Sequence, residues 1–439
     1  MAGKNKTESA WNAILEDYNI VENIESYGSY EIKASEIKKY REPRLMVKWD
    51  SIDNLPKALK RNSLNVIPNS RGSYIISDFN LYEQFPVLTK ATTKIEHIDI
   101  PKLETIDVDE ITTESAAIYV LLISGVIQKF LDTGDFFITF SGRMGTGEFD
   151  FNIDRKKNEP IGIHVDRAQC EIDAGLENDE CVVIIEAKNV LHPDFNVRQL
   201  YFPYRCWDKK VDKPIRLLYS VYTNKVFRLY EYVFEDKYNY SSIKCVKSGL
   251  FSLENTVITL NELVRIVEST KVIYKDRQGT GLIPFPQADV FERIISLLDI
   301  LSNEPLDTIE IADVMEFHER QSDYYYNAGK YLGIFEKKTM DDRIKVCVTS
   351  LGMTLVRLPY REKQIEFVRL LAQHKLFNRL LLNTFKNKKV PCRKVVVQEI
   401  LDLRIFGDNP SMSTVIRRAA TVRKWLEWCY VLSIDEDEI

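Results

Sequence analysis

The clearest pattern of polar and apolar positions lies between residues 169 and 188, and it predicts a β-hairpin. Residues 169–175 alternate, residues 182–185 are wholly apolar, and Asn178 stands in the polar stretch between them as a turn signal. The apolar run ends in Glu186-Ala187-Lys188. Because strand side chains alternate between faces, Glu186 and Lys188 point the same way.

The pairing of this hairpin determines which charges meet. With the turn centred between residues 178 and 179, Asp173 is expected opposite Ile184. The same register sets Glu171 opposite Glu186. Carboxylates gathered on one face repel one another unless a cation lies among them. We therefore expect a metal site whose face carries four charged side chains: Glu171, Asp173, Glu186 and Lys188. A solvated face of an edge hairpin is the alternative.

Around the hairpin, helical and strand patterns alternate, which predicts a mixed α/β sheet domain over residues 86–275. Residues 113–131 have apolar positions at helical spacing, with Thr113 or Ser115 as the cap. The glycine-rich stretch 142–147 has no Gly-Lys-Ser/Thr and no helix pattern after it, so a hairpin tip is expected rather than a phosphate loop. A further helix is expected over 194–207, and strands over 136–140, 148–153, 214–222 and 226–234.

Residues 1–85 form a separate region that is rich in cations. Arg71 precedes Gly72-Ser73-Tyr74, which has the pattern of a loop followed by a strand. A cation near an aromatic ring suits phosphate contact or base stacking, and DNA contact is one interpretation of this region. An ordinary mixed surface is an equal alternative. The cations are Arg41, Arg44, Lys48, Lys57, Lys60, Arg61 and Arg71.

The last third of the chain is strongly helical, and it predicts two winged-helix domains over residues 286–358 and 363–439. In the first, three helices over about residues 290–334 precede a two-stranded wing at 337–348. The third helix of such a unit usually enters the major groove of DNA. Its candidate contact residues here are Gln321, Tyr324, Tyr325, Tyr326, Asn327 and Lys330.

The second predicted winged-helix domain concentrates positive charge. Helices are expected over residues 364–385, 394–401 and 411–430. The last helix has a cationic stripe, and residues 386–394 add more lysines and an arginine, as DNA binding needs. A protein–protein module is the alternative. The stripe consists of Arg417, Arg418, Arg423 and Lys424.

Composition narrows the class of protein without naming a partner. The 439 residues suggest about two to four domains. The net charge of −5 does not indicate a nucleic-acid partner. Any argument for such a partner must therefore come from local clusters of charge. Seven dispersed cysteines and five scattered histidines argue against a zinc site or a disulfide framework, and they favour a reducing cytoplasm. The N-terminus has no apolar signal, and the best apolar helix, near residues 116–127, is too short for a bilayer, so no membrane association is expected.

Two short patterns together resemble a nuclease motif. Asp173 stands thirteen positions before Glu186, and Glu186-Ala187-Lys188 follows, which resembles PD-(D/E)xK, although Ile172 replaces the proline. Three further segments make the chain similar to a family of type II restriction endonucleases: Arg-Glu-Pro-Arg-Leu-Met from residue 41, Pro-Asn-Ser-Arg-Gly-Ser-Tyr from residue 68, and Arg-Arg-Ala-Ala-Thr-Val-Arg-Lys-Trp-Leu from residue 417.

The resemblance implies a PD-(D/E)xK α/β core with C-terminal all-α winged-helix domains, and Mg²⁺-dependent, site-specific hydrolysis of double-stranded DNA. Asp173 and Glu186 would hold Mg²⁺, with Glu171 as an additional ligand, and Lys188 would position or activate water. Asp150 is the rival for the first acid. A homodimer would supply two active sites for a double-strand cut. The weaker supporting candidates are Glu114 and Gln199.

Two other functions stay open. One is a repair or recombination nuclease that cuts by DNA structure instead of sequence. The other is a non-catalytic DNA-binding regulator built on winged helices. The regulator would explain the C-terminal third but would leave the Glu-Ala-Lys strand without a role.

Overall fold

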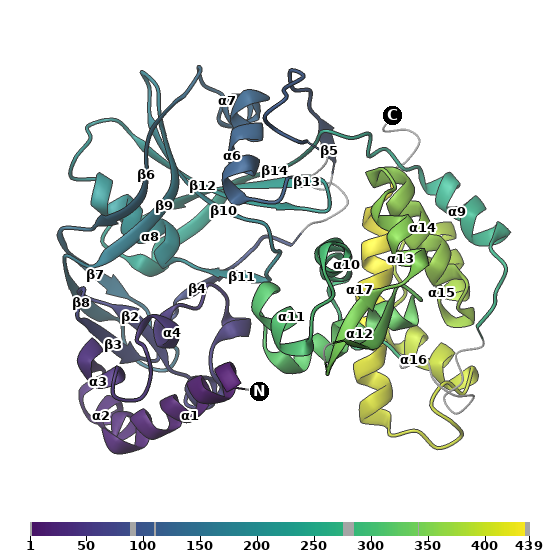
Figure 1. Cartoon of the computed structure of the whole chain (residues 1–439), viewed down its shortest axis with the longest axis horizontal. Coiled ribbons are helices and arrows are strands. Elements are labelled where there is room, and N and C mark those ends of the chain that lie inside the picture. Colours follow the sequence, from purple (N-terminus) through teal and green to yellow (C-terminus); the bar gives the residue numbers. More distant parts are fainter. Residues whose placement is uncertain (1, 88–93, 109–110, 275–284, 341, 435–439) are drawn as a thin grey trace. The chain divides into compact units, whose positions relative to one another are not determined.

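The computed structural model describes residues 2–87, 94–108, 111–274, 285–340 and 342–434 (Figure 1). The chain is of mixed α/β class, as expected, and it divides into two compact units. The first comprises residues 1–87, 100–222 and 228–249, and the second comprises residues 88–99, 223–227 and 250–439. The finer division into four domains stays a prediction. Among the described residues, every helix is too short or too polar to cross a bilayer.

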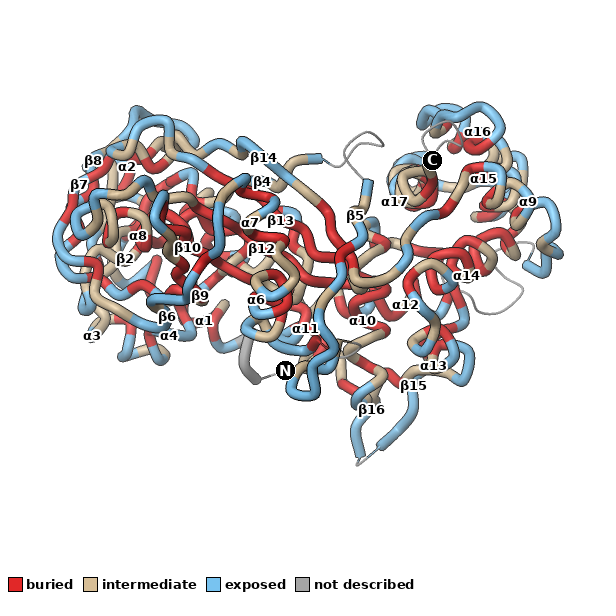
Figure 2. Tube along the Cα trace, turned by 90° about the horizontal axis from the view of Figure 1, so that it is seen from above, coloured by how far each residue is buried: buried red, intermediate tan, exposed pale blue. Residues whose placement is uncertain are grey.

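A seven-stranded mixed sheet, in the order β5-β14-β13-β12-β10-β9-β6, organises the sequence that was expected to form the core. β10 pairs parallel with β12 and antiparallel with β9. β10 lies between two strands, and both of its faces are buried, which explains its unbroken apolar run. Figure 2 shows this burial, whereas the edge strand β6 is largely exposed. The strands are β5 (Ile95–His97), β6 (Phe137–Gly145), β9 (Gln169–Glu177), β10 (Val182–Lys188), β12 (Ile215–Thr223), β13 (Val226–Phe234) and β14 (Ile243–Ser252).

β9 and β10 form the predicted hairpin, but the predicted register is wrong by two residues. Val182 pairs with Glu177 and Ile185 pairs with Ala174, a register that, continued by one position, sets Asp173 opposite Glu186. The turn is set by Asn178, whose side-chain oxygen accepts hydrogen bonds from the N–H groups of residues 180 and 181, both at 2.9 Å. A shift of two residues leaves every side chain on its expected face.

Two helices, α6 and α8, pack against this hairpin, and α7 follows α6. α6 (Glu114–Ile123) begins at the predicted cap Thr113, whose hydroxyl accepts from the N–H of Ala116 at 3.1 Å. The expected single helix over 113–131 is interrupted at Gly125, which has a φ of 69°, and α7 (Val126–Leu131) follows. α8 (Arg198–Trp207) packs on β9 and β10. It is preceded by a short strand, β11 (Asp194–Asn196), so the helix expected over 194–207 is shorter than predicted.

The predicted glycine loop over 142–147 is wrong. Residues 142–145 belong to β6, where Gly142 pairs with Ile172 and Gly145 pairs with Gln169. Only Thr146 and Gly147 turn the chain into β7 (Glu148–Ile153), which pairs with β8 (Ile161–Asp166) in a separate two-stranded sheet. Residues 142–145 extend β6 because they pair with β9, a strand that the sequence pattern of residues 142–147 does not contain.

The N-terminal part of the first unit has its own three-stranded sheet, in the order β1-β3-β2, and its own apolar core. A further strand, β4 (Tyr82–Gln84), pairs with β11. The strands of the sheet are β1 (Tyr30–Lys33), β2 (Asn65–Pro68) and β3 (Ser73–Ser77). The helices around it are α1 (Ala2–Asp17), α2 (Ile20–Tyr27), α3 (Ala34–Ile37), α4 (Arg44–Val47) and α5 (Lys57–Arg61).

The second unit begins its main helical part with the pattern expected for a winged helix. Three helices, α10 (Phe291–Asn303), α11 (Thr308–Val314) and α12 (Glu319–Tyr331), precede a hairpin of β15 (Phe335–Met340) and β16 (Arg343–Val348). An isolated bridge joins Leu306 to Val346. The three helices and the two-stranded hairpin of the prediction are thus confirmed as elements.

The remaining helices of the second unit are α9 (Leu260–Ser269), α13 (Ser350–Val356), α14 (Tyr360–Ala372), α15 (Lys375–Lys386), α16 (Arg393–Asp402) and α17 (Met412–Val431). The helix predicted over 364–385 is two helices, α14 and α15, which meet at His374. Within residues 360–434, all of which are described, no paired strands form a second wing.

Candidate active site

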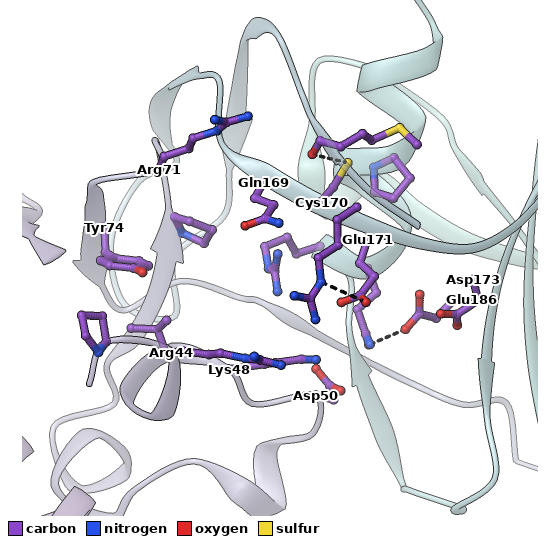
Figure 3. A pocket seen from close by; sticks show the side chains of 18 of the residues that line it. Arg44, Lys48, Asp50, Arg71, Tyr74, Gln169, Cys170, Glu171, Asp173 and Glu186 are labelled. Atoms are coloured by element: carbon purple, nitrogen blue, oxygen red, sulfur yellow. Dashed lines mark hydrogen bonds and ion pairs between the residues drawn. The ribbon is translucent and has the colours of Figure 1, made fainter. Parts of the chain in front are cut away.

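A cavity of about 720 Å³ in the first unit gathers most of the residues that the hairpin pattern singled out (Figure 3). Its walls come from β6, the ends of β9 and β10, α8, and the N-terminal segment 34–74. Seven predicted site residues line it: Arg71, Glu114, Glu171, Asp173, Glu186, Lys188 and Gln199.

Asp173 and Glu186 lie side by side at one end of the cavity. Asp173 Oδ2 accepts a hydrogen bond from the N–H of Ala187 at 2.8 Å, which holds this carboxylate against β10. Only 6% of Glu186 is exposed. Lys188 Nζ and Gln199 Nε2 each donate to Glu186 Oε1, both at 2.6 Å. The acid pair is therefore held in place by backbone and side-chain contacts from two elements, β10 and α8.

Two further contacts complete this end of the cavity. Lys188 Nζ lies 3.7 Å from Glu114 Oε1 and donates to the carbonyl oxygen of Ala187 at 3.2 Å. Gln199 Oε1 is buried and has no hydrogen-bond partner among the described residues. Both predicted supporting residues, Glu114 and Gln199, thus lie within reach of the Glu186–Lys188 pair.

Burial dominates the electrostatics of this pair. It raises the pKa of Glu186 to about 8; the negative charge of Asp173 acts in the same direction, and Lys188 acts against both. For Lys188, burial lowers the pKa, but the carboxylates of Glu186 and Glu114 outweigh it and raise the pKa well above its usual value. Lys188 therefore keeps its proton when Glu186 is ionised.

Glu171 lies in the cavity, but its carboxylate is engaged elsewhere. It forms an ion pair with Arg143 of β6, with 3.2 Å between Arg143 Nε and Glu171 Oε1. Within the described residues, no group of three His, Cys, Asp or Glu side chains is close enough to hold a metal ion. The geometry thus favours two acids, Asp173 and Glu186, over the predicted three.

Asp150, the rival for the first acid, lies on β7, outside the set of residues that line the cavity. Its carboxylate is exposed and contacts His164 Nδ1 at 2.7 Å. Asp173 is the acid that strand pairing brings beside Glu186, as the sequence suggested.

The cavity also contains residues that were not assigned to this site from the sequence. Besides Lys188, five cations line it: Arg71, which the sequence assigned to DNA contact, and Arg44, Lys48, Arg143 and Arg198. Asp50 lines it too and interacts electrostatically with Glu186 and Lys188. The backbone N–H of Asn196 donates to the Asp50 carbonyl oxygen at 2.8 Å, which ties the N-terminal segment to β11, the strand that precedes α8. The cations of the segment were visible as a cluster, but nothing in the sequence linked them to the hairpin.

The predicted DNA-contacting residues of the second unit lie on α12 and α17. Tyr325 is 3% exposed and stacks on Phe317 with 5.2 Å between ring centroids, so it belongs to the core of this unit rather than to a DNA-facing surface. Tyr326 is likewise buried. Tyr324 and Asn327 are half-buried, and Lys330 is exposed.

Two of the four cations in the stripe on α17, Arg423 and Lys424, interact with neighbouring groups of the same unit. Arg423 donates to the Pro391 carbonyl oxygen at 3.0 Å and to Glu427, and Lys424 Nζ lies 3.5 Å from Glu427 Oε2. Arg417 is exposed and forms no ion pair with any described residue. Half-buried Arg418 lies within electrostatic range of Arg417 and of Tyr324 on α12. Tyr324, Arg417 and Arg418 are the members of the set that come together.

Three family models match parts of the chain. Residues 8–76 match Domain of unknown function (DUF6996), residues 77–252 match Domain of unknown function (DUF6997), and residues 293–434 match Domain of unknown function (DUF7226). No curated protein and no solved structure matches the chain. The acid pair and Lys188 fall in the second matched region, while Arg44, Lys48 and Arg71 fall in the first, so residues of two matched regions build one cavity.

Proposed function

We propose that the protein is a Mg²⁺-dependent endonuclease that hydrolyses phosphodiester bonds in double-stranded DNA. The observation that carries the proposal is the position of Asp173 and Glu186, side by side and next to Lys188, in a cavity with five further cations on its walls. Cations at a cavity wall suit the phosphate groups of a nucleic acid. The resemblance of Asp173 and Glu186-Ala187-Lys188 to PD-(D/E)xK supports the same chemistry.

Asp173 and Glu186 would hold the Mg²⁺ ion. Mg²⁺ is usually bound by one or two carboxylates together with water and substrate phosphates, so a two-acid site fits it. Burial, together with the charge of Asp173, raises the pKa of Glu186, and a divalent cation would offset the charge that the two acids bring together. The buried Gln199 Oε1 is a further oxygen that can accept a hydrogen bond from bound water. When bound, the ion supplies Lewis-acid stabilisation of the phosphoryl oxygens.

The side chains of the protein would divide the remaining work. The Lys188 ammonium group, held by Glu186 and Glu114, positions the attacking water and stabilises developing negative charge. Gln199 keeps Glu186 oriented through its hydrogen bond. Arg44, Lys48 and Arg198 would neutralise the phosphates beside the scissile bond.

Site-specific cleavage, as in a type II restriction enzyme, is the form of this activity that the sequence resemblance favours. The helices α10–α12 with the hairpin β15–β16 are the elements of a winged helix, and exposed cations such as Lys330 and Arg417 suit the backbone of duplex DNA. A homodimer would bring two active sites to the two strands.

The test is incubation of plasmid DNA with the full chain in Mg²⁺ and, as a control, in EDTA. Discrete bands in Mg²⁺ alone are expected, and sequencing of the cut ends would give the recognition site. Smeared products without fixed ends would favour cleavage by DNA structure. Retarded but uncut DNA would favour the non-catalytic regulator and overturn the proposal.

A further inference from the structure

The cavity is larger than its reactive end requires, and its far end has a different chemistry. A cavity of about 720 Å³ lies in the range that accommodates a drug-sized ligand. Figure 3 shows Tyr74 and Arg71 on the side of the cavity away from Asp173 and Glu186. Gln169 lies between that side and the acid pair. Besides the charged residues named above, the lining includes Glu42, which lies within electrostatic range of Tyr74.

The ring of Tyr74 lines the cavity, and packing against the N-terminal sheet restricts its movement. It lies on β3, the central strand of the N-terminal sheet, where it pairs with Ile32 of β1 and Pro68 of β2. Its ring is partly buried against the core of this sheet and also lines the cavity. A fixed aromatic ring stacks on a base at little entropic cost, because it has few rotamers to lose.

Glu42 adds a carboxylate beside Tyr74, where phosphate is disfavoured and an amino group is favoured. Its side chain is exposed, lines the cavity and lies within electrostatic range of the Tyr74 hydroxyl. It forms no ion pair with any described residue. A carboxylate repels phosphate oxygens but accepts hydrogen bonds from the amino group of a base.

Arg44, Lys48 and Arg198 lie between the two ends of the cavity, and Arg71 lies on the side of Tyr74. In Figure 3, the side chains of Arg44 and Lys48 extend from the side of Tyr74 towards Asp50. Arg198, on α8, lies within electrostatic range of Tyr74. From the Tyr74 side, where Arg71 also lies, the cavity therefore passes from an aromatic ring and a carboxylate to Arg44, Lys48 and Arg198 and then to the acid pair. This order corresponds to base, phosphate and reacting phosphorus in a nucleotide.

We propose that the Tyr74 end of the cavity binds one unpaired nucleobase with an amino group, stacked on Tyr74 and hydrogen-bonded to Glu42. This inference rests on the proposed nuclease function and names the form of its substrate. A base inside a duplex is stacked on both faces and its amino group is paired, so the bound nucleotide is single-stranded or extruded from the helix.

Binding of labelled single-stranded oligonucleotides in EDTA, followed by fluorescence anisotropy, tests the subsite without cleavage. The probes are oligo-dC, oligo-dT and an abasic oligonucleotide of the same length. The wild-type protein is expected to bind oligo-dC roughly 5- to 150-fold more tightly than the abasic chain, the range for stacking of one base. Equal affinity for oligo-dC and the abasic chain would overturn the proposal.

Variants assign any base preference to this end of the cavity. Tyr74→Leu, which keeps apolar volume in the sheet, is expected to lose the preference, and Tyr74→Phe is expected to keep it. Glu42→Gln is expected to narrow the difference between oligo-dC and oligo-dT. Tyr27→Leu, at a tyrosine that is 79% exposed and outside the cavity, is the matched control. Retention of the full preference by a Tyr74→Leu protein with wild-type thermal stability would refute the assignment.

Plasmid cleavage in Mg²⁺ by the same preparations separates this inference from the proposed function. Cleavage by a wild-type protein that shows no base preference would refute the subsite alone. Base-dependent binding without cleavage would refute the nuclease and leave the subsite in place.

Discussion

At Glu186, burial and two charged neighbours act on a single carboxylate in opposite directions. Burial and Asp173 together outweigh Lys188, so the pKa of Glu186 is about 8 in the folded chain, against about 4.5 for an ordinary glutamate. Between these two values the folded protein keeps a proton that the unfolded chain has released. A cation bound there replaces that proton, so metal binding and proton release are coupled.

We predict that the metal-free protein loses stability as the pH rises from about 4.5 to about 8, because a raised carboxyl pKa favours the folded state only at low pH. The free energy of unfolding, measured in EDTA from pH 5 to 9, should fall relative to that of Glu186→Gln, by at most about 5 kcal/mol. Glu31→Gln, at an exposed glutamate, should show no such trend. A difference between wild type and Glu186→Gln that does not change with pH would contradict the prediction.

Substitution of the reactive residues is expected to separate catalysis from folding. Asp173→Ala and Lys188→Ala should each lower Mg²⁺-dependent cleavage by at least about 100-fold, because each removes charge at the reacting phosphate. DNA retardation and the circular dichroism spectrum should stay close to those of the wild type. Asp150→Ala should cleave normally, since Asp150 lies outside the cavity. Full activity in Asp173→Ala together with its loss in Asp150→Ala would reverse the assignment.

At the scale of elements, strand β9 packs tightly between its neighbours β10 and β6 at Gly175. Gly175 pairs with Ile184 of β10 and with Phe140 of β6. A Cβ at this position would lie 2.2 Å from the Phe140 ring, which itself stacks on Trp207 with 3.9 Å between centroids. The ring therefore has little freedom to move, and the absence of a side chain at 175 allows the three strands to pack.

We predict that Gly175→Ala lowers the free energy of unfolding by about 1–3 kcal/mol, the usual cost of overpacking a core. Gly134→Ala is the control, because a Cβ there has nothing within 4 Å. Thermal melts of both variants, monitored by circular dichroism, would measure the difference. Equal melting temperatures would show that Phe140 and Trp207 relax freely.

At the scale of the whole molecule, the proposed activity needs DNA binding by residues outside the cavity. In the second unit, the exposed Arg417 lies beside Arg418, which is within electrostatic range of Tyr324. This is the part of the predicted cationic stripe whose charge is not neutralised by a described neighbour.

We predict that Arg417→Gln weakens binding to duplex DNA and lowers the slope of log affinity against log salt concentration by about 0.9, the loss of one phosphate contact. Arg404→Gln removes an arginine that is already paired with Asp408 at 3.1 Å and should leave the slope unchanged. Fluorescence anisotropy at several salt concentrations gives both values. An unchanged slope for Arg417→Gln would place the DNA contact elsewhere.

The local sequence pattern was enough to predict features that depend on the side-chain period of a strand or on the capping residue of a helix. The faces of Glu186 and Lys188 follow from the two-residue period of a strand, and they survived a register error of two residues for the same reason. Thr113 was identifiable as a cap because capping depends on a few neighbouring residues. Breaks within helices, as at Gly125 and His374, were missed because apolar spacing continues across them.

By itself, the sequence thus determined the mixed α/β class, the hairpin and the shared face of its charges, since these follow from short-range periodicity. Only the tertiary structure decided what meets that face. Asp50, the cations of segment 34–74 and Tyr74 reach the cavity through contacts between segments more than a hundred residues apart, such as the hydrogen bond from Asn196 to Asp50. Tyr325 likewise entered a core instead of a surface, because the burial of a residue depends on neighbours that its own helix does not contain.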